Sequence, residues 1–214
     1  VSAVGRQGWA FTVQDLVLPW RTPQLARRLG RMFRAVVNEK TQRLIETQIV
    51  NDPSYRDLKK AGVEFTGIND PLTPQEEYFQ SKWLESIPYA GQIIKGSERG
   101  FVTYMNLLRL EHGKRMIRGS DGSKEALKQI ARTVNVFSGR ANVNPGKLKS
   151  LMQGSTPALW APSLYVSRFQ FVLGEPLYGG NAHTRKLVAK EYATTLGALG
   201  ALYGLIGLYN RMSD

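Results

Sequence analysis

Apolar side chains recur every three or four positions along most of the chain, the spacing typical of amphipathic α-helices. Leu25 and Met32 belong to such a stripe in a predicted helix over residues 22–49. We expect further helices over residues 73–88, from about 97 to 113, over 124–138, around 163–174, and from about 184 to the C-terminal end. The pattern predicts an all-α fold, an irregular bundle of about six helices.

The segments between these helices are rich in turn residues. Residues 51–70 are polar and contain two glycines, so we expect a connector with little local structure. The segment SLYVSRFQFVLG suits a helix or a short strand, and we favour the helix. No clear linker divides the chain, so residues 1–214 are expected to form a single helical module. Because the chain begins with Val1 and its opening is unlike a signal peptide, we interpret it as a fragment of a larger protein or a processed product.

The C-terminal segment is the most unusual part of the pattern, because residues 192–209 carry no charge. Each glycine inside a helix costs roughly 0.8–1 kcal/mol relative to alanine, so a run of them indicates a compensating helix contact. We expect an oligomer-facing or buried helix, and insertion into a membrane is the alternative. The candidate interface residues are Gly197, Gly200, Gly204 and Gly207 on one face, with Leu199 and Ile206 among the bulky side chains on another.

The charge balance favours an anionic partner. The chain has 29 Lys and Arg against 17 Asp and Glu, a net charge of +12, which attracts nucleic acid or anionic membranes. A basic strip along the first long helix is the candidate contact for nucleic-acid phosphates, and an ordinary solvated helix face is the alternative. The strip consists of Arg27, Arg28, Arg31 and Arg34.

The sequence offers little catalytic chemistry. It contains no cysteine, which excludes disulfides, thiolate metal sites and cysteine nucleophiles. The two histidines, His112 and His183, lie in basic surroundings without the spacing of a metal site, so we interpret them as surface or capping residues. We therefore expect no catalytic residue, no metal and no cofactor, and a protein that is not an enzyme.

Three blocks of the sequence resemble a known family. They are PLTPQEEYFQSKWLESIP with GSERGFVTYMNLLRLE, then VNVFSGRANV, and then APSLYVSRFQFVLGEPLYGGNAHTRKLVAKEYATTLGALGALYGLIGL. They resemble a helical module of the large polyvalent proteins of bacteriophages, multidomain chains thought to travel in the virion and to enter the host with the DNA. The most family-like positions are Ser97, Glu98, Arg99, Asn106, Arg109, Gly139, Arg140, Ser167, Arg168, Arg185 and Lys186.

The resemblance implies a nonenzymatic role as an internal, or ejection, protein of the virion, in structure, assembly and genome delivery. The expected partners are further copies of the chain, other virion proteins, phage DNA and the host membrane. The expected location is the virion interior, with delivery to the host envelope or cytoplasm. Two other functions stay open: a nucleic-acid-binding module that acts inside the infected cell, and a membrane-active component of a conduit for the genome.

Overall fold

The computed structural model describes residues 8–67, 90–140 and 162–213, and within these ranges it is helical without strands. The predicted all-α class is confirmed, although these ranges alone hold eight α-helices, more than predicted. The elements are α2 (Trp9–Val17), α3 (Thr22–Val37), α4 (Glu39–Val50), α5 (Pro53–Ala61), α7 (Ala90–Arg118), α8 (Lys124–Phe137), α10 (Pro162–Val172), the 3-10 helix η1 (Glu175–Tyr178) and α11 (Ala182–Ser213).

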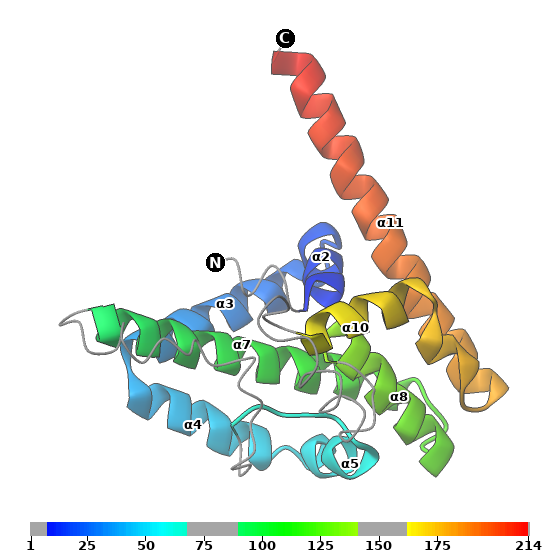
Figure 1. Ribbon diagram of the computed structural model, residues 1–214, viewed down its shortest axis with the longest axis horizontal. Coiled ribbons are helices and arrows are strands. Elements are labelled where there is room, and N and C mark those ends of the chain that lie inside the picture. Colours follow the sequence, from blue (N-terminus) through cyan, green and yellow to red (C-terminus); the bar gives the residue numbers. More distant parts are fainter. Residues whose placement is uncertain (1–7, 68–89, 141–161, 214) are drawn as a thin grey trace.

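Helix α7 is the centre of the fold (Figure 1). It contacts α3, α4, α5 and α8, and all ten residues from 101 to 110 are buried. The predicted end of this helix at Gly113 is wrong, because α7 continues to Arg118. At Gly113 the missing side chain leaves room for Leu58 of α5, whose Cδ1 atom would lie 2.7 Å from a Cβ there. The glycine therefore serves helix packing and does not end the helix.

Helices α3 and α7 approach each other closely where α7 carries two glycines. A Cβ on Gly96 would lie 2.8 Å from the carbonyl oxygen of Val36, and one on Gly100 would clash with the Val36 side chain. Arg99, between the two glycines, donates a hydrogen bond of 2.9 Å from Nη2 to the same Val36 carbonyl. This bond satisfies one of the carbonyls that the end of α3 leaves unpaired.

Two predictions for the first third of the chain are corrected. The single helix expected over residues 22–49 is two helices, because Asn38 is extended (φ −135°, ψ 113°) and its side chain accepts a hydrogen bond from the Lys40 amide. The connector expected over residues 51–70 contains α5. Asp52 caps the start of α5 through the Ser54 amide, and Gly62 ends it with φ 107°.

Some other predicted boundaries agree with the structure, but α7 begins at Ala90, before the start predicted near residue 97. Ser123 Oγ accepts a hydrogen bond of 3.2 Å from the Ala126 amide and caps α8, and Gly139 follows the end of α8 with φ 86°. The segment SLYVSRFQFVLG forms α10, and α11 begins two residues before the predicted position. The helix predicted over residues 73–88 lies outside the described residues.

The non-helical segment after α5 is held by two buried asparagine amides. Asn106 of α7 accepts from the Thr66 amide at 2.9 Å and donates to the Thr66 carbonyl at 2.8 Å. Asn135 of α8 accepts from the Glu64 amide at 3.1 Å and donates to the Gly62 carbonyl at 2.8 Å. Side chains thus provide the hydrogen bonds that a neighbouring strand would otherwise supply.

Candidate functional site

The first half of α11 is fixed to the rest of the molecule. Gln14 of α2 donates hydrogen bonds to Thr195 Oγ1 at 2.6 Å and to the Glu191 carbonyl at 3.2 Å. Arg115 of α7 forms an ion pair with Glu191 at 3.1 Å. The residues of α11 that are buried share one face of the helix: Thr184, Val188, Glu191, Tyr192, Thr195 and Ala198.

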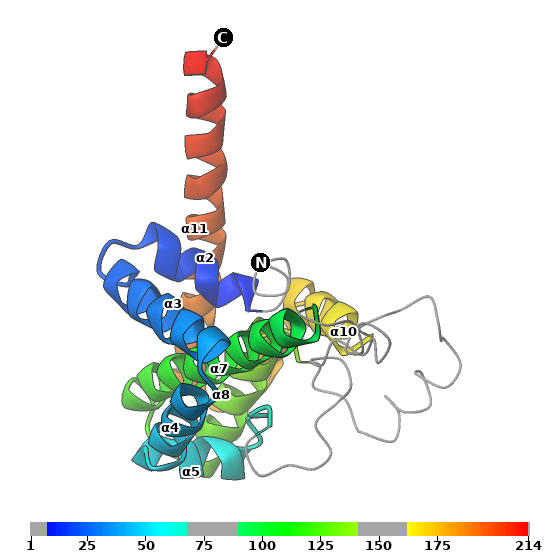
Figure 2. The same cartoon turned by 90° about the vertical axis from the view of Figure 1, so that its left-hand side faces the viewer.

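The second half of α11 extends away from the other helices (Figures 1 and 2). No residue from 199 to 213 is buried, although most of the side chains are apolar; Tyr203 is 71% exposed and Ile206 is 47% exposed. By length and composition, α11 is the one helix among the described residues that is suited to cross a membrane. The predicted long apolar C-terminal helix is confirmed, and the described residues leave its far half uncovered.

The glycines of α11 lie on the side opposite to its buried face, because each residue turns the helix by about 100°. A Cβ added at any of them would meet no other atom within 4 Å. They therefore make no close helix contact within the described chain, unlike the glycines of α7. The interface role predicted for Gly197, Gly200, Gly204 and Gly207 stays a prediction. The same holds for the role predicted for Leu199 and Ile206.

Arg28 does not belong to an exposed basic strip, which corrects the prediction for this residue. Its side chain is fully buried and forms ion pairs with Asp15 of α2 and with Glu111 of α7, the latter at 2.9 Å. Burial raises the pKa of Glu111, and the charge of Arg28 opposes this rise. Arg28 thus joins three helices in the core, where phosphate has no access to it.

His112 belongs to the same buried cluster, so its interpretation as a surface residue is wrong. Its ring stacks on Phe11, with ring centroids 3.8 Å apart. Burial, together with the nearby charge of Arg115, lowers the pKa of His112 to about 3, so the ring is neutral at pH 7. His183 is a capping residue as predicted, because its Nε2 lies 2.9 Å from the Gly119 carbonyl at the end of α7.

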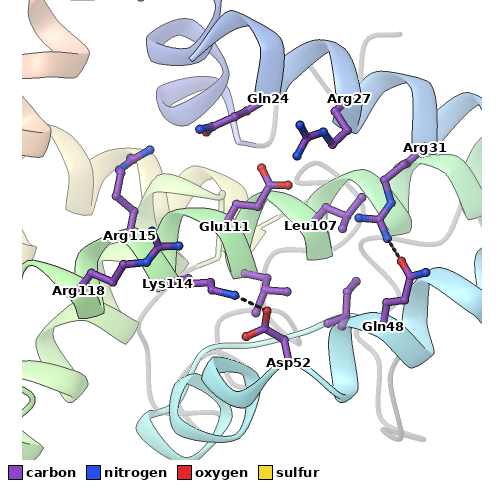
Figure 3. A pocket seen from close by; sticks show the side chains of 12 residues that line it. Gln24, Arg27, Arg31, Gln48, Asp52, Leu107, Glu111, Lys114, Arg115 and Arg118 are labelled. Atoms are coloured by element: carbon purple, nitrogen blue, oxygen red, sulfur yellow. Dashed lines mark hydrogen bonds and ion pairs between the residues drawn. The ribbon is translucent and has the colours of Figure 1, made fainter. Parts of the chain in front are cut away.

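Of the remaining three arginines of the predicted strip, two line a common cleft and one does not. Arg34 is exposed, whereas Arg27 and Arg31 line a cleft of about 440 Å³ between α3, α4 and α7 (Figure 3). The cleft also contains three cationic residues near the end of α7, which the sequence pattern did not connect with α3. The charged and amide side chains that line it are Gln24, Arg27, Arg31, Gln48, Asp52, Glu111, Lys114, Arg115 and Arg118.

Two of the arginines at which the sequence resemblance was noted have structural roles. Arg109 is buried and donates hydrogen bonds to Ser138 Oγ at 3.0 Å and to Thr66 Oγ1 at 2.9 Å. Arg140, also buried, donates to the same Thr66 hydroxyl at 3.1 Å. Thr66 therefore connects α7 with the end of α8. The sequence did not indicate this role, because no distinctive pattern surrounds Thr66.

Comparisons of the chain with protein-family models, with curated proteins and with solved structures found no match.

Proposed function

We propose that this chain is a nonenzymatic assembly module of a bacteriophage virion protein, in which the exposed half of α11 packs against α11 of a second copy. In this proposal the protein lies inside the virion, contacts other virion proteins and contributes to genome delivery. The resemblance of its three sequence blocks to the large polyvalent proteins supports the phage context. The observation that carries the assembly role is the uncovered apolar half of α11.

Exposure of this segment to water is unfavourable. The large apolar side chains exposed beyond Ala198 are contiguous along the helix, and such patches are typical of interaction surfaces. Each of the four glycines also lowers intrinsic helix stability without any compensating contact inside the described chain. Contact with a partner that covers the apolar side chains and the glycines would offset these costs. The exposed residues concerned are Tyr203, Leu205, Ile206, Leu208, Tyr209 and Met212.

Two observations favour a second copy as this partner. The segment from Tyr192 to Asn210 carries no charge, so two identical helices can lie side by side there without repulsion between like charges. The same chain already uses glycines four residues apart for close helix contact, because Gly96 and Gly100 of α7 let α3 approach. The open glycines of α11 provide the same kind of surface for a helix from outside.

The geometry is less suited to a membrane crossing. Residues 199–212 span roughly 21 Å as a helix, whereas the hydrocarbon core of a bilayer is about 30 Å thick. The first half of α11 could enter a bilayer only by leaving its contacts with Gln14 and Arg115. A membrane-active role is nevertheless the second candidate, because α11 as a whole has the length and composition of a membrane span.

Light scattering coupled to size-exclusion chromatography tests the assembly role. We expect the wild-type chain to form dimers or larger species, and the double variant Gly200→Ile, Gly204→Ile to be monomeric, because the added side chains separate the two backbones. Ala201→Ile is the matched control, since it adds the same side chain about 100° around the helix from Gly200. A wild-type chain that is monomeric at all concentrations, or a double variant that still assembles, would refute the proposal.

Vesicle flotation separates the second candidate from the first. If α11 inserts, the wild-type chain floats with anionic vesicles and the double variant Leu199→Asp, Ile206→Asp does not, because a charge at bilayer depth costs at least about 2.5 kcal/mol. We expect the wild-type chain to stay in the soluble fraction. Mass spectrometry of purified virions tests the phage context, and absence of the polypeptide from the particles would refute it.

A further inference from the structure

The cleft between α3, α4 and α7 gathers positive charge from helices that are far apart in the sequence. Figure 3 shows Arg27 and Arg31 reaching toward it from α3, and Arg118 lying at the end of α7. Its lining has five cationic residues and two carboxylates, so it has a net positive charge. The cations are Arg27, Arg31, Lys114, Arg115 and Arg118, and the carboxylates are Asp52 and Glu111.

Both carboxylates of the cleft already bind cations. Asp52 Oδ2 lies 2.6 Å from Lys114 Nζ, and the other Asp52 oxygen caps α5. Glu111 is paired with the buried Arg28. In contrast, neither Arg27 nor Arg118 has an ion pair with any residue that the structure describes, and both are exposed. The positive charge of these two arginines is therefore available to a ligand.

The remaining polar groups of the cleft are also mainly hydrogen-bond donors. Arg31 donates to the Gln48 side chain, which leaves the Gln48 amide nitrogen free to donate in turn. Burial lowers the pKa of Arg31, Glu111 opposes this, and the nearby Arg27 lowers the pKa further. Concentrated positive charge of this kind is stabilised when an anion enters.

We propose that this cleft binds phosphate groups, with Arg27 and Arg118 as the principal contacts. Guanidinium groups match the oxygens of phosphate in pairs, which makes arginine the preferred residue for this chemistry. The lining contains no aromatic side chain on which a base could stack, so recognition is of phosphate and not of base sequence. A single-stranded nucleic acid and a free polyphosphate both carry this group.

Fluorescence anisotropy with a labelled single-stranded thymidine dodecamer, and calorimetry with tripolyphosphate, test the cleft. The variant Arg27→Gln, Arg118→Gln is expected to weaken binding by about tenfold and, for the dodecamer, to reduce the slope of log affinity against log salt by about 1.4. Arg34→Gln, Arg56→Gln is the control, because it removes the same charge from exposed arginines of α3 and α5 outside the cleft. Both variants are expected to unfold at the wild-type temperature.

The outcomes separate the possible sources of phosphate. Loss of dodecamer binding in the cleft variant alone supports the cleft and identifies nucleic acid as its ligand. Binding of tripolyphosphate but not of the dodecamer, again lost only in the cleft variant, supports the cleft and identifies a small phosphate compound. Equal weakening in the cleft and control variants indicates that net charge alone attracts the probe, and overturns the proposal. Failure of the wild-type chain to bind either probe also overturns it.

Discussion

Nε2 of His112 lies 2.9 Å from Oδ2 of Asp15, at the point where α2 and α7 meet. On the other side of the ring, Nδ1 lies 2.6 Å from the Arg115 guanidinium, which can only donate. The neutral ring therefore carries its proton on Nε2 and donates it to Asp15. Burial alone would raise the pKa of Asp15, but its contacts with His112 and Arg28 outweigh this effect and lower the pKa to about 2.

The lowered pKa of His112 makes stability depend on pH. Unfolded His112 takes up a proton near pH 6.5, whereas the folded ring does so only near pH 3, so between these values the unfolded state binds more protons. The free energy of unfolding should therefore fall as pH decreases from about 6.5 toward 3, by up to roughly 1.4 kcal/mol per pH unit from this group. Asp15 adds a loss below about pH 4. Urea unfolding at a series of pH values measures both effects.

His112→Gln is the control for this prediction, because glutamine can donate to Asp15 but does not titrate. The dependence of unfolding free energy on pH between 6.5 and 4.5 should be shallower in this variant. Equal slopes in the variant and the wild type would show that His112 is protonated in the folded state.

Loss of the Arg28 charge should destabilise the fold. Arg28→Met keeps much of the side-chain volume but leaves the buried Asp15 without its cation, and removal of one partner of a buried ion pair costs about 3–5 kcal/mol. Arg27→Met, one residue earlier and exposed, should change the free energy of unfolding by less than about 0.5 kcal/mol. Denaturant unfolding of the two variants measures the difference, and similar values for both would contradict the buried position of Arg28.

Two glycine-to-alanine changes should have opposite effects. At Gly96 the new Cβ meets the Val36 carbonyl oxygen of α3, so the helices must move apart and stability should fall by about 1–2 kcal/mol. At Gly30 the new Cβ meets no atom within 4 Å, so the higher helix propensity of alanine should raise stability by up to about 1 kcal/mol. Thermal unfolding gives the sign of each change, and a gain for Gly96→Ala would exclude close contact between α3 and α7.

Local sequence signals predicted the elements that have local causes. Ser123 and Gly139 mark the ends of α8 because capping and positive φ depend on neighbouring residues. The same kind of signal was available for α5, where Asp52 precedes a proline and Gly62 follows the helix, but the polar composition of the segment concealed it. Gly113 misled the prediction because its role depends on α5, which packs against it.

The sequence pattern could not distinguish Arg28 from the arginines around it. A helical wheel places Arg28 beside Arg27, Arg31 and Arg34, and only the arrival of Asp15 and Glu111 from other helices makes its burial favourable. For the same reason the predicted strip did not include Arg118, which reaches the cleft from another part of the chain. Helix periodicity gives the face of a residue, whereas its partners come from tertiary packing.

Helix α11 runs without a break from its half that packs on α2 to its exposed end. Its exposed end contributes no residue to the lining of the cleft between α3, α4 and α7. The proposed attachment through α11 and the proposed binding of phosphate in the cleft therefore use separate surfaces of the molecule.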